Sequence, residues 1–179
     1  MSLQQRPEGS AEAGEAPLIR PMDPRRDREP IVGCVAGLQD FERTLEPTLP
    51  PGGQIARRYV EAMLQRCAAY RGRVFVAEGA DGIIGFVCVL ARIPETPPDE
   101  TSRPHAAVGE LYVEPDRRGE GIARRLLVRA ETHAVEQGAE RLRVQVLAAN
   151  AGARQLYGDF GFHDRLVELE KPLPAPDVD

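Results

Sequence analysis

The sequence predicts an α/β (α+β) domain in which helices flank a mixed, mostly antiparallel sheet of about six to seven strands. Two observations lead to this fold class. The chain has 179 residues, of which 42% are hydrophobic, and this is enough to bury one core. Segments with the apolar spacing of helices also alternate with short β-rich runs, in the order β-α-α-β-β-β-α-β-α-β.

The first half of the chain predicts a short strand, two helices and a hairpin. Residues 18–20 (LIR) form the strand candidate. Apolar residues recur at helical spacing over about 26–45 and again over about 54–70, with the breaker PTLPPGG between them. The run RVFVAEGADGIIGFVCVLAR then predicts two strands joined around an Asp-Gly turn. The proline-rich segment that follows predicts a surface loop.

The second half alternates strands with helices. The expected elements are a strand at 106–115, a helix at about 120–137 stopped by Gly138, a strand at 141–148, a short helix at 150–162 and a last strand at 163–171. Residues 17–171 then form one domain. We expect disordered tails at 1–16 and 172–179, because both are short of large apolar residues.

Composition excludes several classes of protein. The net charge of −5 provides no overall basic field for nucleic acid, and no apolar run approaches the ~20 residues of a membrane span. The N-terminus lacks the apolar core of a signal peptide. Three cysteines (Cys34, Cys67 and Cys88) are an odd number without metal-ligand spacing, so they are expected to be buried, reduced thiols. We therefore expect a cytoplasmic protein that holds no metal and binds neither nucleic acid nor a membrane.

The stretch PDRRGEGIARRLL, at 115–127, combines the end of a strand, a glycine turn and a helix start. Such a turn lets several N–H groups converge on one anion. Four arginines crowd this helix start, where positive charge is unfavourable unless a multiply charged anion is bound. The alternative is a plain turn followed by an arginine-rich, solvated helix face. A P-loop is excluded because Gly-Lys-Ser/Thr is absent, and a dinucleotide fingerprint has Arg124 in place of its third glycine.

These residues resemble a known family. The run Arg118-Gly119-Glu120-Gly121-Ile122-Ala123 fits the Gln/Arg-x-x-Gly-x-Gly/Ala signature of the GNAT acyltransferases, the GCN5-related N-acetyltransferases. The flanking ELYVEP and RRLL are similar to that family's strand and helix. Downstream, Asn150-Ala151, Leu156-Tyr157 and Phe160-Gly161-Phe162 resemble its later motif. The resemblance covers roughly residues 17 to 171.

The resemblance implies the GNAT fold with splayed strands 4 and 5, and acetyl-CoA or another acyl-CoA as the donor. The amides of the glycine turn would bind its pyrophosphate; these belong to Arg118, Gly119, Glu120, Gly121, Ile122, Ala123 and Arg124. Backbone groups of Leu111, Tyr112 and Val113 would hold the pantetheine arm between the two splayed strands. Asn150 would contact the CoA arm, cap the following helix, or do both.

Acyl transfer to an amine requires a proton acceptor for the amine and a proton donor for the departing thiolate. Tyr157 resembles the family's acid, although a core tyrosine is the alternative. Glu110 is the base candidate because it begins the strand that should approach the thioester. Its carboxylate is flanked by the apolar residues Val108 and Leu111, and burial among them would raise its pKa. The alternative is a solvent-facing strand residue. A ping-pong route through Cys88 is less favoured, because nothing nearby lowers its pKa.

The sequence also bears on which amine accepts the acyl group. Acidic residues gather in two regions expected beside the acceptor pocket, namely Asp40, Glu42, Glu46, Glu95, Asp99 and Glu100. They suit a cationic amine, such as a polyamine, an aminoglycoside, a lysine side chain or a protein N-terminus; alternatively, they only solvate exposed loops. The leading hypothesis is an N-acetyltransferase acting by direct attack in a ternary complex. The alternatives are a non-catalytic acyl-CoA-binding regulatory module and an anion-binding fold for a different nucleotide. Many family members are dimers, so the resemblance also allows a homodimer.

Overall fold

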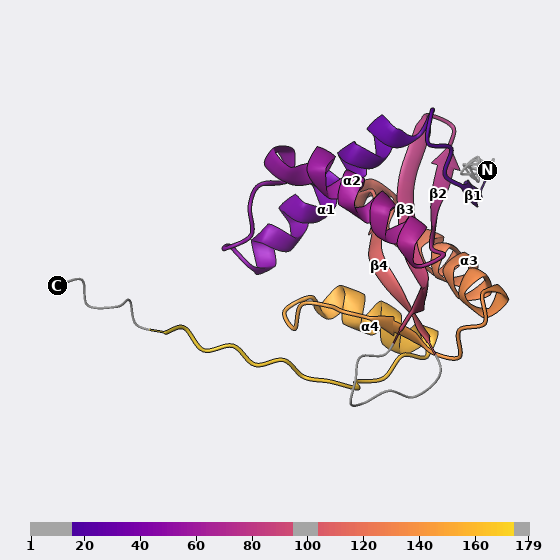
Figure 1. The fold of residues 1–179 in the computed structure, drawn as a ribbon. Helices are drawn as coiled ribbons and strands as arrows, with labels where there is room; N and C mark the ends of the chain where they lie inside the picture. Colours follow the sequence, from indigo (N-terminus) through magenta and orange to yellow (C-terminus); the bar gives the residue numbers. More distant parts are fainter. Residues whose placement is uncertain (1–15, 95–103, 174–179) are drawn as a thin grey trace, which may run out of the picture.

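The computed structural model describes residues 16–94 and 104–173 (Figure 1). Most of the two expected tails and the acidic residues Glu95, Asp99 and Glu100 lie outside these ranges. The elements in chain order are β1 (Leu18–Pro21), α1 (Arg28–Leu45), α2 (Gly52–Ala69), β2 (Arg73–Gly79), β3 (Gly82–Ile93), β4 (His105–Val113), the 3₁₀ turn η1 (Pro115–Arg117), α3 (Ile122–Glu136), β5 (Leu142–Val144) and α4 (Ala151–Phe160). This order matches the prediction up to α4.

The sheet is mixed and mostly antiparallel, as predicted. Its strands follow the order β1-β2-β3-β4-β5, and the first four pair antiparallel. Only β5 runs parallel to its neighbour β4, because α3 carries the chain across one face of the sheet between them. The described residues form five strands rather than six or seven.

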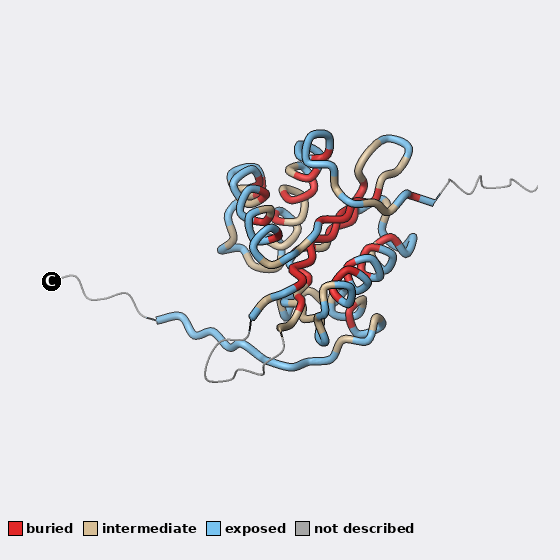
Figure 2. The backbone as a smooth tube through the Cα atoms, turned by 45° about the vertical axis from the view of Figure 1, so that its right-hand side comes forward, coloured by how far each residue is buried: buried red, intermediate tan, exposed pale blue. Residues whose placement is uncertain are grey.

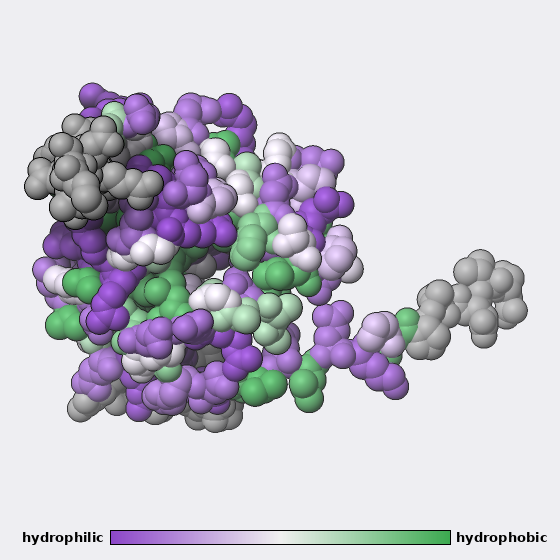
Figure 3. All heavy atoms as spheres, turned by 180° about the vertical axis from the view of Figure 1, so that it is seen from behind, coloured by the Kyte–Doolittle hydropathy of each residue, from purple (hydrophilic) through white to green (hydrophobic). Residues whose placement is uncertain are grey.

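The predicted last strand, at 163–171, is wrong. After α4 the chain runs extended and away from the domain, and apolar side chains line this projecting segment (Figures 1 and 3). Leu166, Val167 and Leu169 are 81%, 72% and 89% exposed. A strand needs a partner edge, and β5 offers only three residues, because the chain leaves the sheet after Val144 instead of continuing to residue 148.

Helices cover both faces of the sheet (Figures 1 and 2). Helix α3 covers one face, where Leu126, Leu127 and Ala130 are fully buried against residues of β2, β3 and β4. Helices α1 and α2 cover the other face, where Val60 and Met63 pack around Phe86 of β3. Burial is therefore concentrated along the central strands, which are apolar on both faces.

A β-bulge in β4 changes which face its side chains occupy. The pairing of β3 with β4 shifts between Cys88↔Glu110 and Val89↔Val108, so Gly109 is the extra residue. Before the bulge, Val108 packs on the α3 side. After it, Tyr112 packs on the α1–α2 side, and Glu110 points the same way. Without the bulge, strict alternation would place Glu110 on the α3 side with Val108.

Glycines mark both ends of α3, as expected. Gly121 precedes the helix with φ +75°, and Gly138 follows it with φ +81°. Side chains rarely adopt this left-handed conformation, which explains glycine at the two positions. Among the described helices, none is both long and apolar enough to cross a membrane.

Candidate active site

The site lies where β4 and β5 separate. The two strands pair only through Ala106↔Leu142, Ala107↔Arg143 and Val108↔Val144. Beyond these pairs the chains diverge, and residues of β4 and of the segment that follows β5 line one pocket. The splay between strands 4 and 5 is thus confirmed, and it begins at the Gly109 bulge.

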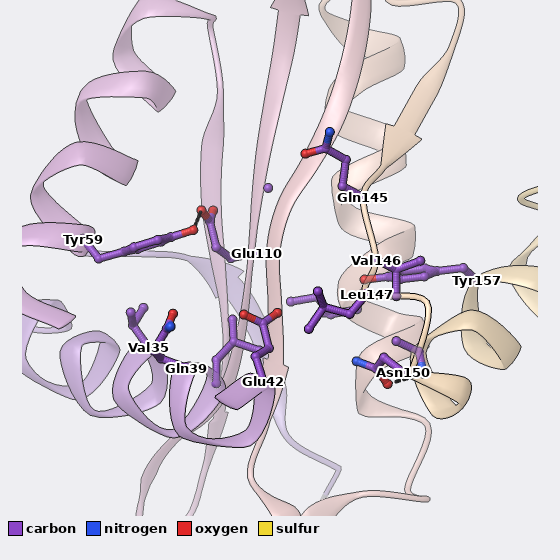
Figure 4. A pocket seen from close by; sticks show the side chains of 14 residues that line it. Val35, Gln39, Glu42, Tyr59, Glu110, Gln145, Val146, Leu147, Asn150 and Tyr157 are labelled. Carbon is purple, nitrogen blue, oxygen red and sulfur yellow. Dashed lines mark hydrogen bonds between the residues drawn. The ribbon is translucent and has the colours of Figure 1, made fainter. Parts of the chain in front are cut away.

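This central pocket has a cavity volume of about 80 Å³ and lies among α1, α2, β4 and α4 (Figure 4). Its walls are Val35, Leu38, Gln39 and Glu42 of α1, Tyr59 of α2, Gly109, Glu110 and Leu111 of β4, Gln145, Val146 and Leu147 after β5, and Asn150, Ala153 and Tyr157 at α4. Both predicted catalytic residues line it, although they are 47 positions apart in the chain, and so do Leu111 and Asn150.

Glu110 is buried, at 4% exposure, so the solvent-facing alternative is wrong. Its Oε1 accepts hydrogen bonds from the Tyr59 hydroxyl (2.8 Å) and from Arg66 Nη2 (2.6 Å). Its Oε2 is also buried and has no partner among the described residues. The carboxylate is therefore held through one oxygen, while the other is free to accept a proton or a hydrogen bond.

Tyr157 reaches the pocket from the opposite side, from α4 (Figure 4). It is 9% exposed and packs edge-on against Phe162, with ring centroids 5.5 Å apart. Burial, together with the negative charge of Glu42, raises the pKa of Tyr157 to about 12. The phenol therefore stays protonated at neutral pH and retains a proton to donate. Tyr157 is both a core residue and a pocket residue.

Asn150 caps α4, which confirms one of the two roles expected for it. Its Oδ1 accepts a hydrogen bond from the Ala153 N–H at 3.0 Å. This bond satisfies one of the free donors in the first helical turn. The cap uses only the side-chain oxygen, so the Asn150 amide nitrogen remains at the pocket wall.

The glycine turn presents free N–H groups at the start of α3. The first helical hydrogen bond there runs from Arg125 to the Gly121 carbonyl (3.1 Å), which leaves the amides of Ile122, Ala123 and Arg124 without an intrahelical acceptor. A Cβ built on Gly119 or Gly121 would meet no atom within 4 Å. An open surface with free donors and a helix dipole behind it fits the phosphates of an acyl-CoA.

The arginines of this turn already have protein partners. Arg117 forms two hydrogen bonds with Glu120, at 2.9 and 3.0 Å. Arg118 donates through Nε to the Val113 carbonyl (3.0 Å) and lies 5.0 Å from the Phe41 ring centre. The ion pair of Arg117 with Glu120 offsets part of the charge conflict that the sequence presents, and the contacts of Arg118 hold its side chain in place. The amides of the turn, rather than these side chains, are the groups left for a ligand.

The β4 backbone is also available. Beyond Val108 no described strand pairs with the β5-facing edge of β4, so Leu111, Tyr112 and Val113 lie beside the opening. The side chains of Tyr112 and Val113 are buried, and the Tyr112 hydroxyl donates to Glu114 at 3.0 Å. Tyr112 and Val113 can therefore contact a ligand in the splay through their backbone groups, whereas Leu111 lines the pocket.

Cys88 is unsuited to act as a nucleophile. It is fully buried, and its Sγ lies 3.2 Å from Sγ of Cys67. Contact with that thiol and burial raise the pKa of the Cys88 thiol well above its ordinary value. A thiol held in its neutral form is a poor nucleophile, which disfavours the ping-pong route.

The acidic residues expected near the acceptor separate into two groups. Asp40 accepts the Gly52 N–H (2.7 Å), and Glu46 accepts the Thr48 hydroxyl (2.5 Å), so both stabilise local turns. Glu42 instead lines the pocket. Sequence reasoning missed Tyr59 and Arg66, because nothing local marks a helix residue as the partner of a carboxylate 44 or 51 positions away.

Comparisons with known proteins agree with this geometry. The model of the Acetyltransferase (GNAT) family matches residues 38–162. No curated protein matches the chain significantly. The GCN5-related N-acetyltransferase from Ralstonia eutropha JMP134 is similar in structure, with TM-score 0.66 and 19% identity over 87% of this chain and 97% of its own. The ribosomal-protein-alanine N-acetyltransferase from Brucella melitensis biovar Abortus 2308 has TM-score 0.64 and 22% identity, over 89% and 100% of the two chains.

A third structure similar to this chain was solved with CoA bound. It is the aminoglycoside N-acetyltransferase AAC(6′)-Iy, with TM-score 0.60 and 19% identity over 87% of this chain and 99% of its own. At these identities the likeness concerns the fold alone. The family match covers more than half of the chain and includes the glycine turn, β4 and α4. This chain therefore belongs to the GNAT family of acetyltransferases, which use acyl-CoA as the donor.

Proposed function

We propose that the protein transfers the acetyl group of acetyl-CoA to a primary amine by direct attack in a ternary complex. One observation carries the proposal. The opening between β4 and β5 leads to a pocket that holds a buried carboxylate, Glu110, and a protonated phenol, Tyr157, on opposite walls. These are the two proton-transfer groups that the reaction requires.

On the donor side, the amides of residues 119–124 would bind the pyrophosphate, while the Arg118 N–H already donates to the Pro115 carbonyl. The helix dipole of α3 would add to the attraction. The free edge of β4 at 111–113 would hold the pantetheine arm, with Asn150 beside it. This arrangement would place the thioester in the splay, where the pocket opens. Binding both substrates in one orientation would supply much of the rate acceleration.

In the reaction, the amine nitrogen forms a bond to the thioester carbonyl carbon, and the carbon–sulfur bond then breaks. Oε2 of Glu110 would accept the proton that the amine loses, directly or through one water. Tyr157 would donate a hydrogen bond to the sulfur as negative charge develops there. A phenol with a pKa of about 12 is a weaker acid than a thiol at about 8.5, so transfer of its proton to the sulfur would be uphill and would require a proton from water to restore the phenol.

Two measurements test this proposal. Acetyl-CoA should raise the melting temperature far more than ATP or NAD at the same concentration. An equal response to all three ligands would refute the acyl-CoA site and favour a site for another nucleotide. Release of free thiol from acetyl-CoA should then depend on an added primary amine. A protein that binds acetyl-CoA but releases no thiol with any primary amine or lysine peptide would instead be a binding module.

A further inference from the structure

Two carboxylates line the central pocket, and hydrogen bonds within the described part of the protein satisfy only one of their four oxygen atoms. Glu110 comes from β4, and Glu42 comes from α1 (Figure 4). Glu42 lies between Glu110 and Tyr157 in Figure 4. The charge of Glu42 helps to raise the pKa of Tyr157, and the charge of Glu110 helps to raise the pKa of Glu42. The two residues are 68 positions apart, so only the packing of α1 against β4 brings them together.

Hydrogen bonds from other residues satisfy only part of this carboxylate pair. Arg66 is the cation that binds Glu110, and it does so, with Tyr59, through Oε1 alone. Oε2 is buried without a partner. No hydrogen bond or ion pair joins the Glu42 carboxylate to another residue in the described part of the chain, and burial beside Glu110 raises its pKa. A buried acceptor without a partner, such as Oε2 of Glu110, destabilises the free protein, so the pocket favours a ligand that donates hydrogen bonds and carries positive charge.

We propose that the pocket binds the primary ammonium end of an unbranched aliphatic amine, with Glu42 and Oε2 of Glu110 as its acceptors. This inference rests on the proposed function and names the class of acceptor. An ammonium group has three N–H donors and one positive charge, and it can donate to both carboxylates at once. Glu42 binds and orients the ammonium group, while Glu110 accepts the proton whose loss makes the nitrogen nucleophilic; the proton that the nitrogen loses after the attack passes to water.

Size and lining define the class further. A cavity of about 80 Å³ has room for several water-sized groups, since one such group occupies roughly 10–15 Å³ of a cavity. Val35, Leu38 and Leu147 provide apolar walls beside the carboxylates, which suit the methylenes of an alkyl chain. The α-amine of a free amino acid brings its own carboxylate toward two negative charges, and an aromatic amine is neutral and bulky. Lysine side chains and aliphatic diamines meet all these conditions.

The experiment measures binding of 1,4-diaminobutane to the protein saturated with CoA, which cannot react. Titration calorimetry compares the wild type with Glu42→Gln, which keeps the shape of the side chain and removes its charge. The matched control is Glu131→Gln, which removes the same charge from the exposed face of α3. We expect at least tenfold weaker binding for Glu42→Gln and unchanged binding for Glu131→Gln. Glycine and aniline should bind at least tenfold more weakly than 1,4-diaminobutane to the wild type. An undiminished CoA-induced thermal shift in Glu42→Gln shows that this variant is folded.

The outcomes separate the two proposals. Equal binding of 1,4-diaminobutane by Glu42→Gln and wild type overturns the ammonium site, as does binding of glycine with the same affinity; acetyl transfer to another amine could still stand. Binding that depends on Glu42 supports the ammonium site. If the same amine then releases no thiol from acetyl-CoA, the site stands and the transferase proposal fails.

Discussion

Replacing Gly121 by leucine tests whether the glycine turn binds acyl-CoA. Gly121 has φ +75°, and a Cβ at this position meets no atom within 4 Å in the free protein. The substitution therefore adds backbone strain without a steric clash, and this strain costs roughly 1–2 kcal/mol. For a chain of this size, that loss lowers the melting temperature by roughly 2–8 °C. The fold should survive, while the leucine side chain occupies the surface that faces the phosphates.

The assay is the thermal shift produced by acetyl-CoA. At about 100 times its Kd, a ligand stabilises the folded protein by ~2.7 kcal/mol, or roughly 5–10 °C here. We expect Gly121→Leu to lose most of this shift. Gly138→Leu is the matched control, because Gly138 follows the same helix with φ +81° and equally open surroundings. It should melt at a similarly reduced temperature and keep the full shift.

Two results would refute the reasoning. A full acetyl-CoA shift in Gly121→Leu would mean that the turn does not bind the phosphates. Loss of the shift in both variants would mean that strain at α3, rather than obstruction of the turn, abolishes binding. The first result would exclude the free N–H groups at the start of α3 as the phosphate site, and the second would refute the attribution of the loss to obstruction of the turn.

Three further predictions concern the pocket and the stability of the fold. Tyr157→Phe should keep the acetyl-CoA thermal shift and slow turnover by roughly 10²–10⁴-fold; unchanged turnover in a thiol-release assay would remove its role as proton donor. Glu110→Gln should lower kcat by about 10²-fold or more with the shift retained, and a kcat within threefold of wild type would transfer the base role to another group. The pKa of Asp27 is held at about 2, below its ordinary 3.8, chiefly by the hydrogen-bonded ion pair with Arg20 (2.6 and 3.0 Å). A lowered carboxyl pKa stabilises the fold above pH 4, and this stability is lost as the pH falls toward 2. Asp27→Asn should therefore cost about 1–2 kcal/mol at pH 7, after allowance for screening by water, and denaturant titrations should show less loss between pH 4 and 2 than in wild type.

Local signals in the sequence located much of the fold. Glycines that require positive φ marked both ends of α3, and an asparagine marked the start of α4. Helical periodicity located α1 and α2 to within a few residues. These features depend on neighbours within a few positions, so they can be read without the rest of the chain. The strand prediction failed at 163–171, because a local sequence pattern alone does not supply a partner strand.

The sequence by itself determined the order of the elements up to α4, the glycine turn and the residue types needed for proton transfer. The tertiary structure decided how these residues meet. The one-residue bulge at Gly109 turns Glu110 away from α3 and toward Tyr59 and Arg66, and the end of the β4–β5 pairing at Val108 opens the pocket. The packing of α1 then brings Glu42 beside this carboxylate. The physical reason is that register, strand separation and helix packing depend on contacts between residues far apart in the chain, and no local pattern encodes such contacts.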